Sequence, residues 1–375
     1  MGGVALRLVP VLVTLALTAC AARPSVQPGT PSPVLSTLLS PTIPVLPSAV
    51  VKKEVSPFPS LAPVTPSPNP TRSTTPPPSE VYIEFTPWEL VTALSWSPDG
   101  EILAVAAGER IHLYQTGSYL EYRVLEPHIW SPSIAFSPDG ERLASAGRDG
   151  KVRIWDPAAG EALLEIQAHK KGCNAVAYSP KGDNLASAGN DGMVRIWDSS
   201  SGERLSEMIG GAFGIPDIAF LPDGSGLAIA NGNIIRIRDV GTGRFVQTLR
   251  GEASFASVAI APDGLSLAGA GSDSLLLLWD LPQGDIHYQL EDDQGKNGRP
   301  AGLIWQVAFS PDGSLLASAG GDGTLRLWNS SSGELVKIFD KATAAVTSLA
   351  FSPDGRWLAS GGLDARVGIY RIGLP

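Results

Sequence analysis

Cysteine and histidine are scarce in this chain, which has two and four of them among 375 residues. If the thiol of Cys20 is modified, Cys173 has no partner in the chain, and we then expect neither a disulfide nor a cysteine-based metal site. The sequence also contains no His-Glu-x-x-His, Cys-x-x-Cys, Walker A, Gly-x-Ser-x-Gly or Gly-x-Gly-x-x-Gly motif. We therefore expect no enzymatic activity, no metal site and no cofactor.

Basic residues are too few for a protein that binds nucleic acid. Lysine and arginine number 28, against 37 acidic residues. Residues 1–80 hold five of the basic and two of the acidic residues, so residues 81–375 keep 23 and 35 and carry a net charge of −12. Because this part would repel a phosphate backbone, we expect no nucleic-acid partner.

The N-terminus has the pattern of a secretory signal peptide. Arg7 is followed by the apolar run Leu8–Leu17 and then by small residues, which is the order of such a leader. The run is shorter than the ~20 apolar residues that a transmembrane helix needs. We therefore expect export rather than a membrane span.

The end of this leader, Leu17-Thr18-Ala19-Cys20, resembles the lipobox of bacterial lipoproteins. The resemblance implies a signal peptide over residues 1–19, cleavage before Cys20, and attachment of acyl chains such as palmitate at that residue. Two or three acyl chains would anchor the protein to a bacterial membrane, at the cell surface or facing the periplasm. The alternative is an ordinary signal peptide with an accidental cysteine.

The composition of residues 20–80 predicts a tether that follows this anchor. Residues 21–80 contain 16 of the 32 prolines, and Pro, Ser and Thr fill 33 of these 60 positions. Because proline removes backbone donors and blocks helices and central strands, no packed core is expected here. We expect an extended spacer of polyproline type. The alternative is a proline-rich ligand for an SH3-like partner.

The remaining residues, 81–375, contain seven repeats. A tight turn of the Ser-Pro-Asp-Gly type recurs at spacings of 40 to 49 residues. Its seven copies begin at Ser97, Ser137, Ser179, Leu221, Ala261, Ser310 and Ser352. In the best-marked repeats one strand precedes this turn and a short strand follows it. An Asp-Gly turn then leads to a third strand ending in Trp, and a more polar fourth strand closes the unit.

Seven units of four antiparallel strands predict an all-β, seven-bladed β-propeller. The seventh repeat supplies strands at 346–351, 357–360 and 366–370, but no fourth strand. One unassigned strand, Val81–Phe85, stands before the first repeat. We expect it to become the outer strand of the last blade and so to close the ring.

The repeats resemble the WD40 family of β-propellers. The family's signature dipeptide occurs as Trp155-Asp156, Trp197-Asp198 and Trp279-Asp280. The resemblance also implies a structural tetrad of His, Ser, Asp and Trp within a blade. These positions hold His128, Ser145, Asp149 and Trp155 in the second repeat, and His169, Ser187, Asp191 and Trp197 in the third. Because the set recurs from blade to blade, it indicates a structural role and not a hydrolase site.

The same resemblance implies a partner-binding face. In such folds, the connections into the first strands and the turns between the second and third strands share one face, which we name the top face. The residues expected there are Trp88, Trp130, Arg148, Asn174, Asn190, Trp305 and Leu363. The extra residues Glu291–Pro300 would place Asp292 and Asp293 beside Trp305. Large aromatic residues with polar neighbours are typical of interface hot spots.

The sequence thus predicts a monomeric propeller that is lipid-anchored outside the cytoplasm and binds a protein partner. Two other functions stay open, because a fold alone does not fix a function. One is a factor in the assembly of envelope proteins. The other is a propeller enzyme or small-ligand binder with a site in the central channel.

Overall fold

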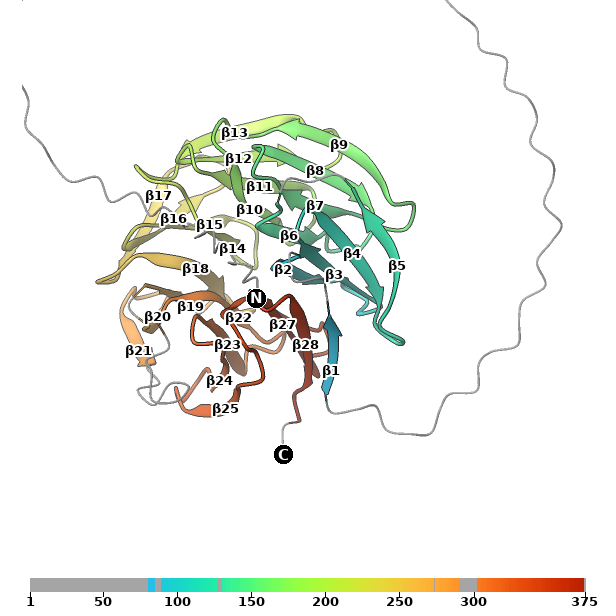
Figure 1. Ribbon diagram of the computed structural model, residues 1–375. Helices are drawn as coiled ribbons and strands as arrows, with labels where there is room; N and C mark the ends of the chain where they lie inside the picture. Colours follow the sequence, from blue (N-terminus) through green and yellow to red (C-terminus); the bar gives the residue numbers. More distant parts are fainter. Residues whose placement is uncertain (1–79, 85–88, 127–129, 273, 291–301, 374–375) are drawn as a thin grey trace, which may run out of the picture. The chain divides into compact units, whose positions relative to one another are not determined.

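Seven antiparallel sheets of four strands are arranged in a ring (Figure 1). The computed structural model describes residues 80–84, 89–126, 130–272, 274–290 and 302–373, all within the unit 73–375. These residues form 28 strands and no helix. The predicted all-β, seven-bladed propeller is therefore confirmed. No helix suited to crossing a membrane occurs in this described part of the chain.

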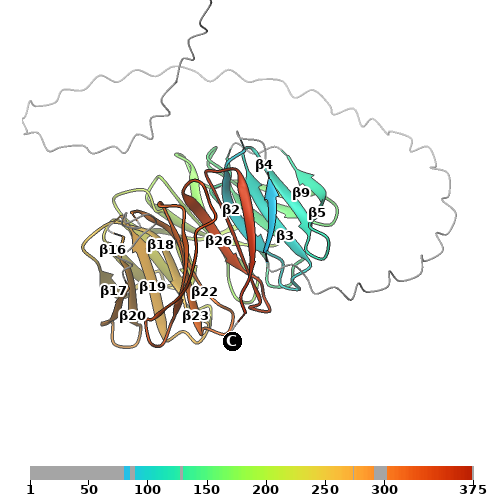
Figure 2. The ribbon, with the colours of Figure 1, turned by 60° about the horizontal axis from the view of Figure 1, so that its bottom comes forward.

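Each blade runs from an inner strand beside the central channel to an outer strand at the rim (Figures 1 and 2). Blade 1 consists of β2 (Val91–Trp96), β3 (Ile102–Ala107), β4 (Arg110–Gln115) and β5 (Leu120–Leu125). Blade 2 consists of β6 (Ser133–Phe136), β7 (Leu143–Ala146), β8 (Lys151–Asp156) and β9 (Glu161–Gln167). Blade 3 consists of β10 (Cys173–Tyr178), β11 (Asn184–Gly189), β12 (Met193–Asp198) and β13 (Arg204–Ile209). Blade 4 consists of β14 (Ile218–Phe220), β15 (Gly226–Asn231), β16 (Ile234–Asp239) and β17 (Phe245–Arg250). Blade 5 consists of β18 (Phe255–Ile260), β19 (Ser266–Gly271), β20 (Leu276–Asp280) and β21 (Ile286–Leu290). Blade 6 consists of β22 (Ile304–Phe309), β23 (Leu315–Gly320), β24 (Leu325–Asn329) and β25 (Leu335–Phe339). Blade 7 consists of β26 (Val346–Phe351), β27 (Trp357–Gly362), β28 (Arg366–Arg371) and β1 (Glu80–Glu84).

The hydrophobic core lies between neighbouring blades rather than at one centre. The second strand of a blade is made of small and apolar residues and is buried, as in β11, whereas the outer strand β9 is mostly exposed. Between blades 1 and 2, the ring of Trp155 packs in one cluster with Ile111 and Leu113. Burial of apolar surface between blades therefore holds the ring together.

The recurring Ser-Pro-Asp-Gly turn uses each of its four residues. In the second copy, Ser137 Oγ accepts from the Arg142 N–H at 3.0 Å, and Asp139 Oδ1 accepts from the Glu141 N–H at 3.0 Å. Gly140 has φ +75°, which a residue with a Cβ rarely adopts. An added Cβ there would also lie 3.3 Å from Pro98 of the preceding blade's turn. The turns thus pack against one another around what we name the bottom face.

The strand before the first repeat closes the ring. β1 pairs with β28 in antiparallel register, with Val81 opposite Ile369 and Ile83 opposite Val367. Val81 and Ile83 pack on the apolar cluster shared by blades 7 and 1. The expected closure is thus confirmed, with the strand at Glu80–Glu84; Phe85 lies outside the described residues.

Candidate partner-binding face and central channel

The structural tetrad is complete in blade 3. His169 Nε2 lies 2.9 Å from Ser187 Oγ, and His169 Nδ1 lies 2.8 Å from Asp191 Oδ1. Trp197 Nε1 donates to the same Ser187 Oγ at 2.9 Å. Burial lowers the pKa of His169, against the attraction of Asp191. The four residues link the incoming connection to β11 and β12, which is a structural task.

Two further blades repeat the Trp–Ser bond. Trp155 Nε1 donates to Ser145 Oγ at 2.9 Å, and Trp328 Nε1 donates to Ser318 Oγ at 3.1 Å. His128, which the sequence placed in the blade 2 tetrad, lies outside the described residues. Since the same bond recurs in three blades, we assign it to the framework and not to a unique reaction site.

An arginine extends the cluster in three blades, and the sequence reasoning missed it. It stands four residues after the tetrad aspartate. The ion pairs are Asp149–Arg153 and Asp191–Arg195 at 2.9 Å and Asp322–Arg326 at 2.8 Å. The recurring spacing Asp-x-x-x-Arg is a signal that could have revealed these pairs, which neutralise the partly buried carboxylates.

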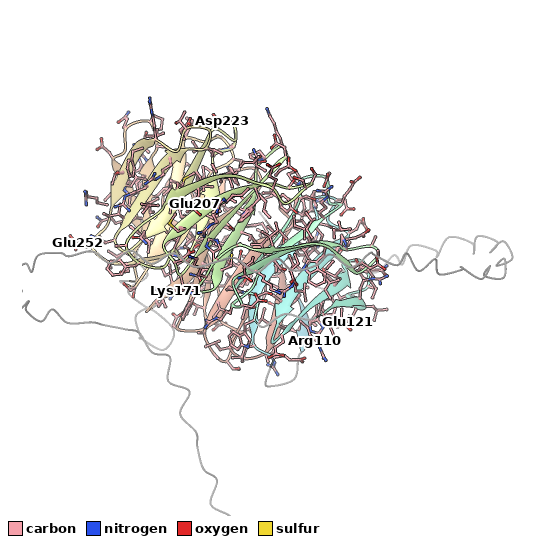
Figure 3. All side chains as sticks on the ribbon, turned by 90° about the horizontal axis from the view of Figure 1, so that it is seen from above. Arg110, Glu121, Lys171, Glu207, Asp223 and Glu252 are labelled. Carbon is pink, nitrogen blue, oxygen red and sulfur yellow. The ribbon has the colours of Figure 1, made fainter. Side chains whose placement is uncertain are left out.

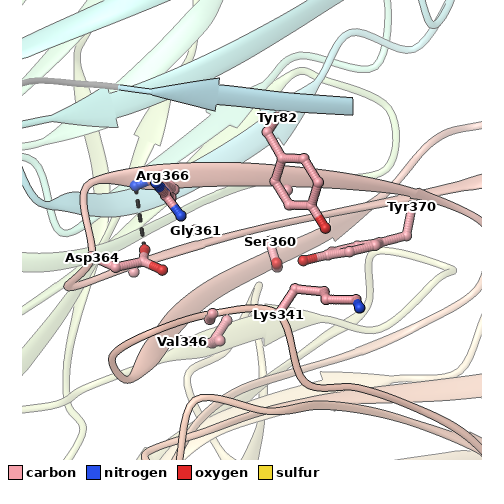
Figure 4. Close-up of a pocket in the computed structure, with 11 residues that line it drawn as sticks. Tyr82, Lys341, Val346, Ser360, Gly361, Asp364, Arg366 and Tyr370 are labelled. Carbon is pink, nitrogen blue, oxygen red and sulfur yellow. Dashed lines mark hydrogen bonds between the residues drawn. The ribbon is translucent and has the colours of Figure 1, made fainter. Parts of the chain in front are cut away.

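Blade 7 lacks the tetrad histidine, and a small pocket lies at that place (Figure 4). Ala342 stands at the position that His169 holds in blade 3, and it lines the pocket together with Ser360, Asp364 and Tyr370. The space measures about 10 Å³, which is room for one water molecule. We therefore attribute this pocket to the missing imidazole ring.

The mouth of the central channel is a larger cavity of about 100 Å³, lined by residues of all seven inner strands or the residues just before them. A side chain at this mouth bridges each of the seven junctions between blades. At three junctions it donates to a backbone carbonyl of the next blade: Thr92 to Ser131 at 2.7 Å, Asn174 to Ile215 at 3.0 Å, and Thr347 to Val91 at 2.8 Å. At four junctions its oxygen accepts from a backbone N–H of the next blade: Ser133 from Val176 at 3.2 Å, Asp217 from Val258 at 3.0 Å, Ser257 from Val307 at 3.3 Å, and Gln306 from Leu349 at 2.8 Å.

Asp217 is the only carboxylate among the lining residues. Ser257 Oγ donates to it at 2.8 Å, and the Ile218 N–H donates at 2.9 Å. Part of the Asp217 side chain remains exposed at the channel mouth, but the surrounding strands exclude most of the water around its carboxylate. This burial raises the pKa of Asp217 to about 6, against the hydrogen bonds that favour its ionised form. Within the described residues, no group of three or more His, Cys, Asp and Glu side chains could hold a metal ion.

Trp130 and Arg148 meet on the top face. The guanidinium carbon of Arg148 lies 5.7 Å from the centre of the Trp130 ring, within the range of a cation–π contact. Trp130 has φ +47°, a left-handed backbone that costs a bulky residue about 1 kcal/mol or more. The Arg148 N–H donates to the Trp130 carbonyl at 3.1 Å. The backbone thus holds this aromatic ring at a defined place.

The other expected top-face residues are spread around the mouth of the channel. Asn174 Nδ2 donates to Asn190 Oδ1 at 2.9 Å. Trp305 lies on β22 itself, lines the channel and is 39% exposed. Leu363 is 45% exposed. Trp88, Asp292, Asp293 and the connection Glu291–Pro300 lie outside the described residues.

Three further exposed residues belong to the top face and were missed from the sequence. Phe213, in the connection from blade 3 to blade 4, is 70% exposed. Lys170 and Lys171 are exposed in the connection from blade 2 to blade 3. Figure 3 shows Lys171 away from Asp223, which belongs to the fourth bottom-face turn. Connections have no periodic pattern, and Lys171 and Phe213 stand at different distances from the strands that follow them, so no signal in the sequence indicated these residues.

Five stretches of the chain match the family model "WD domain, G-beta repeat": residues 121–156, 160–198, 243–280, 296–329 and 333–371. The stretch 160–198, for example, runs from the outer strand of blade 2 to the third strand of blade 3. This offset between repeat and blade explains why a strand from the start of the chain completes the last blade.

Three curated proteins resemble short parts of the chain. The antiviral protein SKI8 of Saccharomyces cerevisiae is 30% identical over 97 residues, which are 21% of this chain and 24% of that protein. The target of rapamycin complex subunit wat1 of Schizosaccharomyces pombe is 38% identical over 72 residues, 18% and 23% of the two chains. The periodic tryptophan protein 2 homolog of Dictyostelium discoideum is 39% identical over 44 residues, 12% and 5%. The matches span a quarter or less of each relative's length. The family matches and the ring of seven blades agree: the chain is a seven-bladed β-propeller that contains WD40 repeats.

Proposed function

We propose that this protein is a membrane-anchored scaffold outside the cytoplasm, which binds a protein partner on the top face of its propeller. The proposal rests on one observation: the residues that stabilise the ring are different from the aromatic residues exposed on or beside the top face. The blade 3 tetrad, the recurring Trp–Ser bonds and the channel bridges stabilise the ring, whereas Trp130 and Trp305 contribute partly exposed aromatic surface on or beside the top face. Aromatic residues of this kind are typical of binding hot spots.

The name of one of the relatives supports a role in assemblies. That relative is by its name a subunit of a complex. The short matches carry that role to this chain only as part of the proposal. WD40 repeats are generally found in non-enzymatic scaffolds, and we therefore propose binding rather than catalysis.

The membrane part of the proposal rests on the sequence of the first 80 residues. Residues 1–19 would be removed as a signal peptide, Cys20 would carry the lipid, and the proline-rich segment to residue 80 would act as a tether. An anchor of this type keeps the propeller close to a membrane while its top face stays available to a partner.

The alternative of a small-ligand site in the channel has less support. The polar side chains at the channel mouth already bond to the neighbouring blades, so a ligand would meet only the hydrogen-bonding capacity that these bridges leave over. The cavity of about 100 Å³ is also smaller than the roughly 300 Å³ and more of typical ligand pockets.

Substitution of the two aromatic residues tests the scaffold function. We expect Trp130→Ala and Trp305→Ala each to weaken partner binding by about 2 kcal/mol, or about 30-fold, because each removes a large contact surface. The measurement is a quantitative pull-down from membranes with the full-length protein, and melting curves check that both variants stay folded.

Lys181→Ala is the matched control for that pull-down. Lys181 is exposed in the third bottom-face turn. It is a better control than Arg142, whose guanidinium donates to the Ser199 carbonyl at 2.7 Å and so stabilises the fold. Loss of the partner in the Lys181 variant, with binding retained in both tryptophan variants, would contradict the proposal.

A further inference from the structure

We propose that the partner segment bound on the top face is acidic and carries apolar side chains between its acidic residues. It would lie across blades 2 to 4, over a surface that we name the cationic arc: Trp130, Arg148, Lys170, Lys171, Asn190 and Phe213. The inference rests on the proposed scaffold function and adds the chemistry of the partner.

The residues of the cationic arc form one continuous surface. Arg148 contacts the Trp130 ring. A Cβ added to Gly172, the residue after the two lysines, would lie 3.2 Å from the Arg148 carbonyl oxygen and 3.2 Å from Asn190 Nδ2. A Cβ added to Gly214, the residue after Phe213, would lie 2.6 Å from Asn190 Oδ1. Neighbouring connections therefore lie close together from blade 2 to blade 4.

The three cations of the arc have no acidic partner among the described residues. Arg148, Lys170 and Lys171 are exposed, and none of them forms an ion pair in this part of the chain. Asp149 and Asp191, the neighbours of Arg148 and Asn190 in sequence, are already paired with Arg153 and Arg195 at 2.9 Å. Glu165, the acidic residue nearest in sequence to the two lysines, pairs with Lys151 and Arg153. The positive charge of the arc is therefore available to a ligand.

The arc differs from its surroundings on the same ring. On blade 1, Arg110 pairs with Glu126 at 2.8 Å, and on blade 6, Arg326 pairs with Asp322. Residues 81–375 have 35 acidic and 23 basic residues. A positive surface on a negative body attracts an acidic segment and leaves little attraction for a long phosphate backbone, which would meet acidic surface beyond the arc.

Apolar side chains frame the charges. The Trp130 ring lies beneath Arg148, and Phe213 is 70% exposed at the far end of the arc. An extended peptide could place apolar residues on these rings and carboxylates on the cations between them. This arrangement favours an acidic peptide with interspersed apolar residues over a purely acidic one.

Fluorescence anisotropy with a labelled peptide of repeated Asp-Leu-Glu-Phe tests the inference on the full-length protein. We expect saturable binding that weakens as salt is raised, because the contact is electrostatic. The double variant Lys170→Glu/Lys171→Glu and the variant Arg148→Glu should each lower the affinity about tenfold or more. Lys181→Glu on the bottom face is the matched control and should bind like the unmodified protein.

Three results would overturn the inference. The first is a Lys181→Glu control that loses as much binding as the arc variants. The second is a peptide with Lys in place of the acidic residues that binds as tightly as the acidic peptide. The third is a single-stranded oligonucleotide of the same charge that binds more tightly than the acidic peptide. Pull-down separates this failure from that of the scaffold function. A native partner that depends on Trp130 and Trp305, but not on the charges of the arc, would retain the scaffold function and overturn only the acidic partner.

Discussion

Deletion of Glu80–Glu84 is expected to lower the free energy of unfolding by on the order of 4 kcal/mol, and the melting temperature by roughly 6 °C. β1 contributes the outer strand of blade 7 and places Val81 and Ile83 on the cluster between blades 7 and 1. Its loss would also leave β28 as an unpaired edge, which favours aggregation. Thermal unfolding of the two proteins, followed by circular dichroism, measures the effect.

The residues that would take the place of β1 cannot replace it. After the deletion, Thr75-Pro76-Pro77-Pro78-Ser79 would stand directly before Phe85, in the place that β1 held, and proline cannot donate to a strand ladder. A matched control removes five residues, 60–64, from the proline-rich segment, and its melting temperature should not change. Equal melting temperatures for both deletions would contradict the role of β1 in ring closure.

Replacement of Cys20 by Ser is expected to abolish lipid attachment completely. The thiol is the proposed acceptor of the first acyl group, so the precursor should remain uncleaved at that site. Mass spectrometry of the mature amino terminus measures this directly. An unmodified Cys20 in the native protein, or cleavage at another position, would show a plain secreted protein instead.

Cys173→Ser is the matched control for the lipid anchor. Cys173 is buried in β10, with its sulfur 3.5 Å from the Ala188 carbonyl, and burial raises the pKa of its thiol. A buried, protonated thiol is a poor nucleophile and a poor lipid acceptor. The control should therefore be lipidated like the native protein.

The fold was predictable because its signals repeat. Seven copies of one turn gave the number of blades, and the missing fourth strand of the last repeat indicated the partner of β28. Trp155 and Trp197 marked the third strands in two blades, and both bond to the expected serines. Each such signal is local in sequence and is confirmed by its neighbours in the other repeats.

The channel bridges were not predictable in the same way. The bridging side chain comes from one of two adjacent positions, and the residue type changes from blade to blade. Blade 3 uses Asn174 and has Ala175 next to it, whereas blade 4 has Pro216 first and uses Asp217. When the repeats are aligned, no single position therefore holds the bridging residue in every blade. The two alternating positions can be recognised only once the structure of the ring is known.

The top face was only partly predictable. The spacing of the repeats placed Arg148 and Asn190 in their turns, but it gave no reason to select Phe213 or Lys171, which lie in connections of irregular length. Trp305 was expected in or near a connection, and it stands on β22 at the channel mouth. Contacts between connections of different blades depend on the closed ring, which no single repeat encodes.

Site-specific photo-crosslinking in membranes is the most direct test of partner docking on the top face. A photoreactive residue would replace Phe213, which is 70% exposed on that face, or Lys181, which is exposed on the bottom face, in the full-length protein. We expect a discrete crosslinked adduct from position 213 and none from position 181. An adduct from position 181 with none from position 213 would contradict binding at the top face.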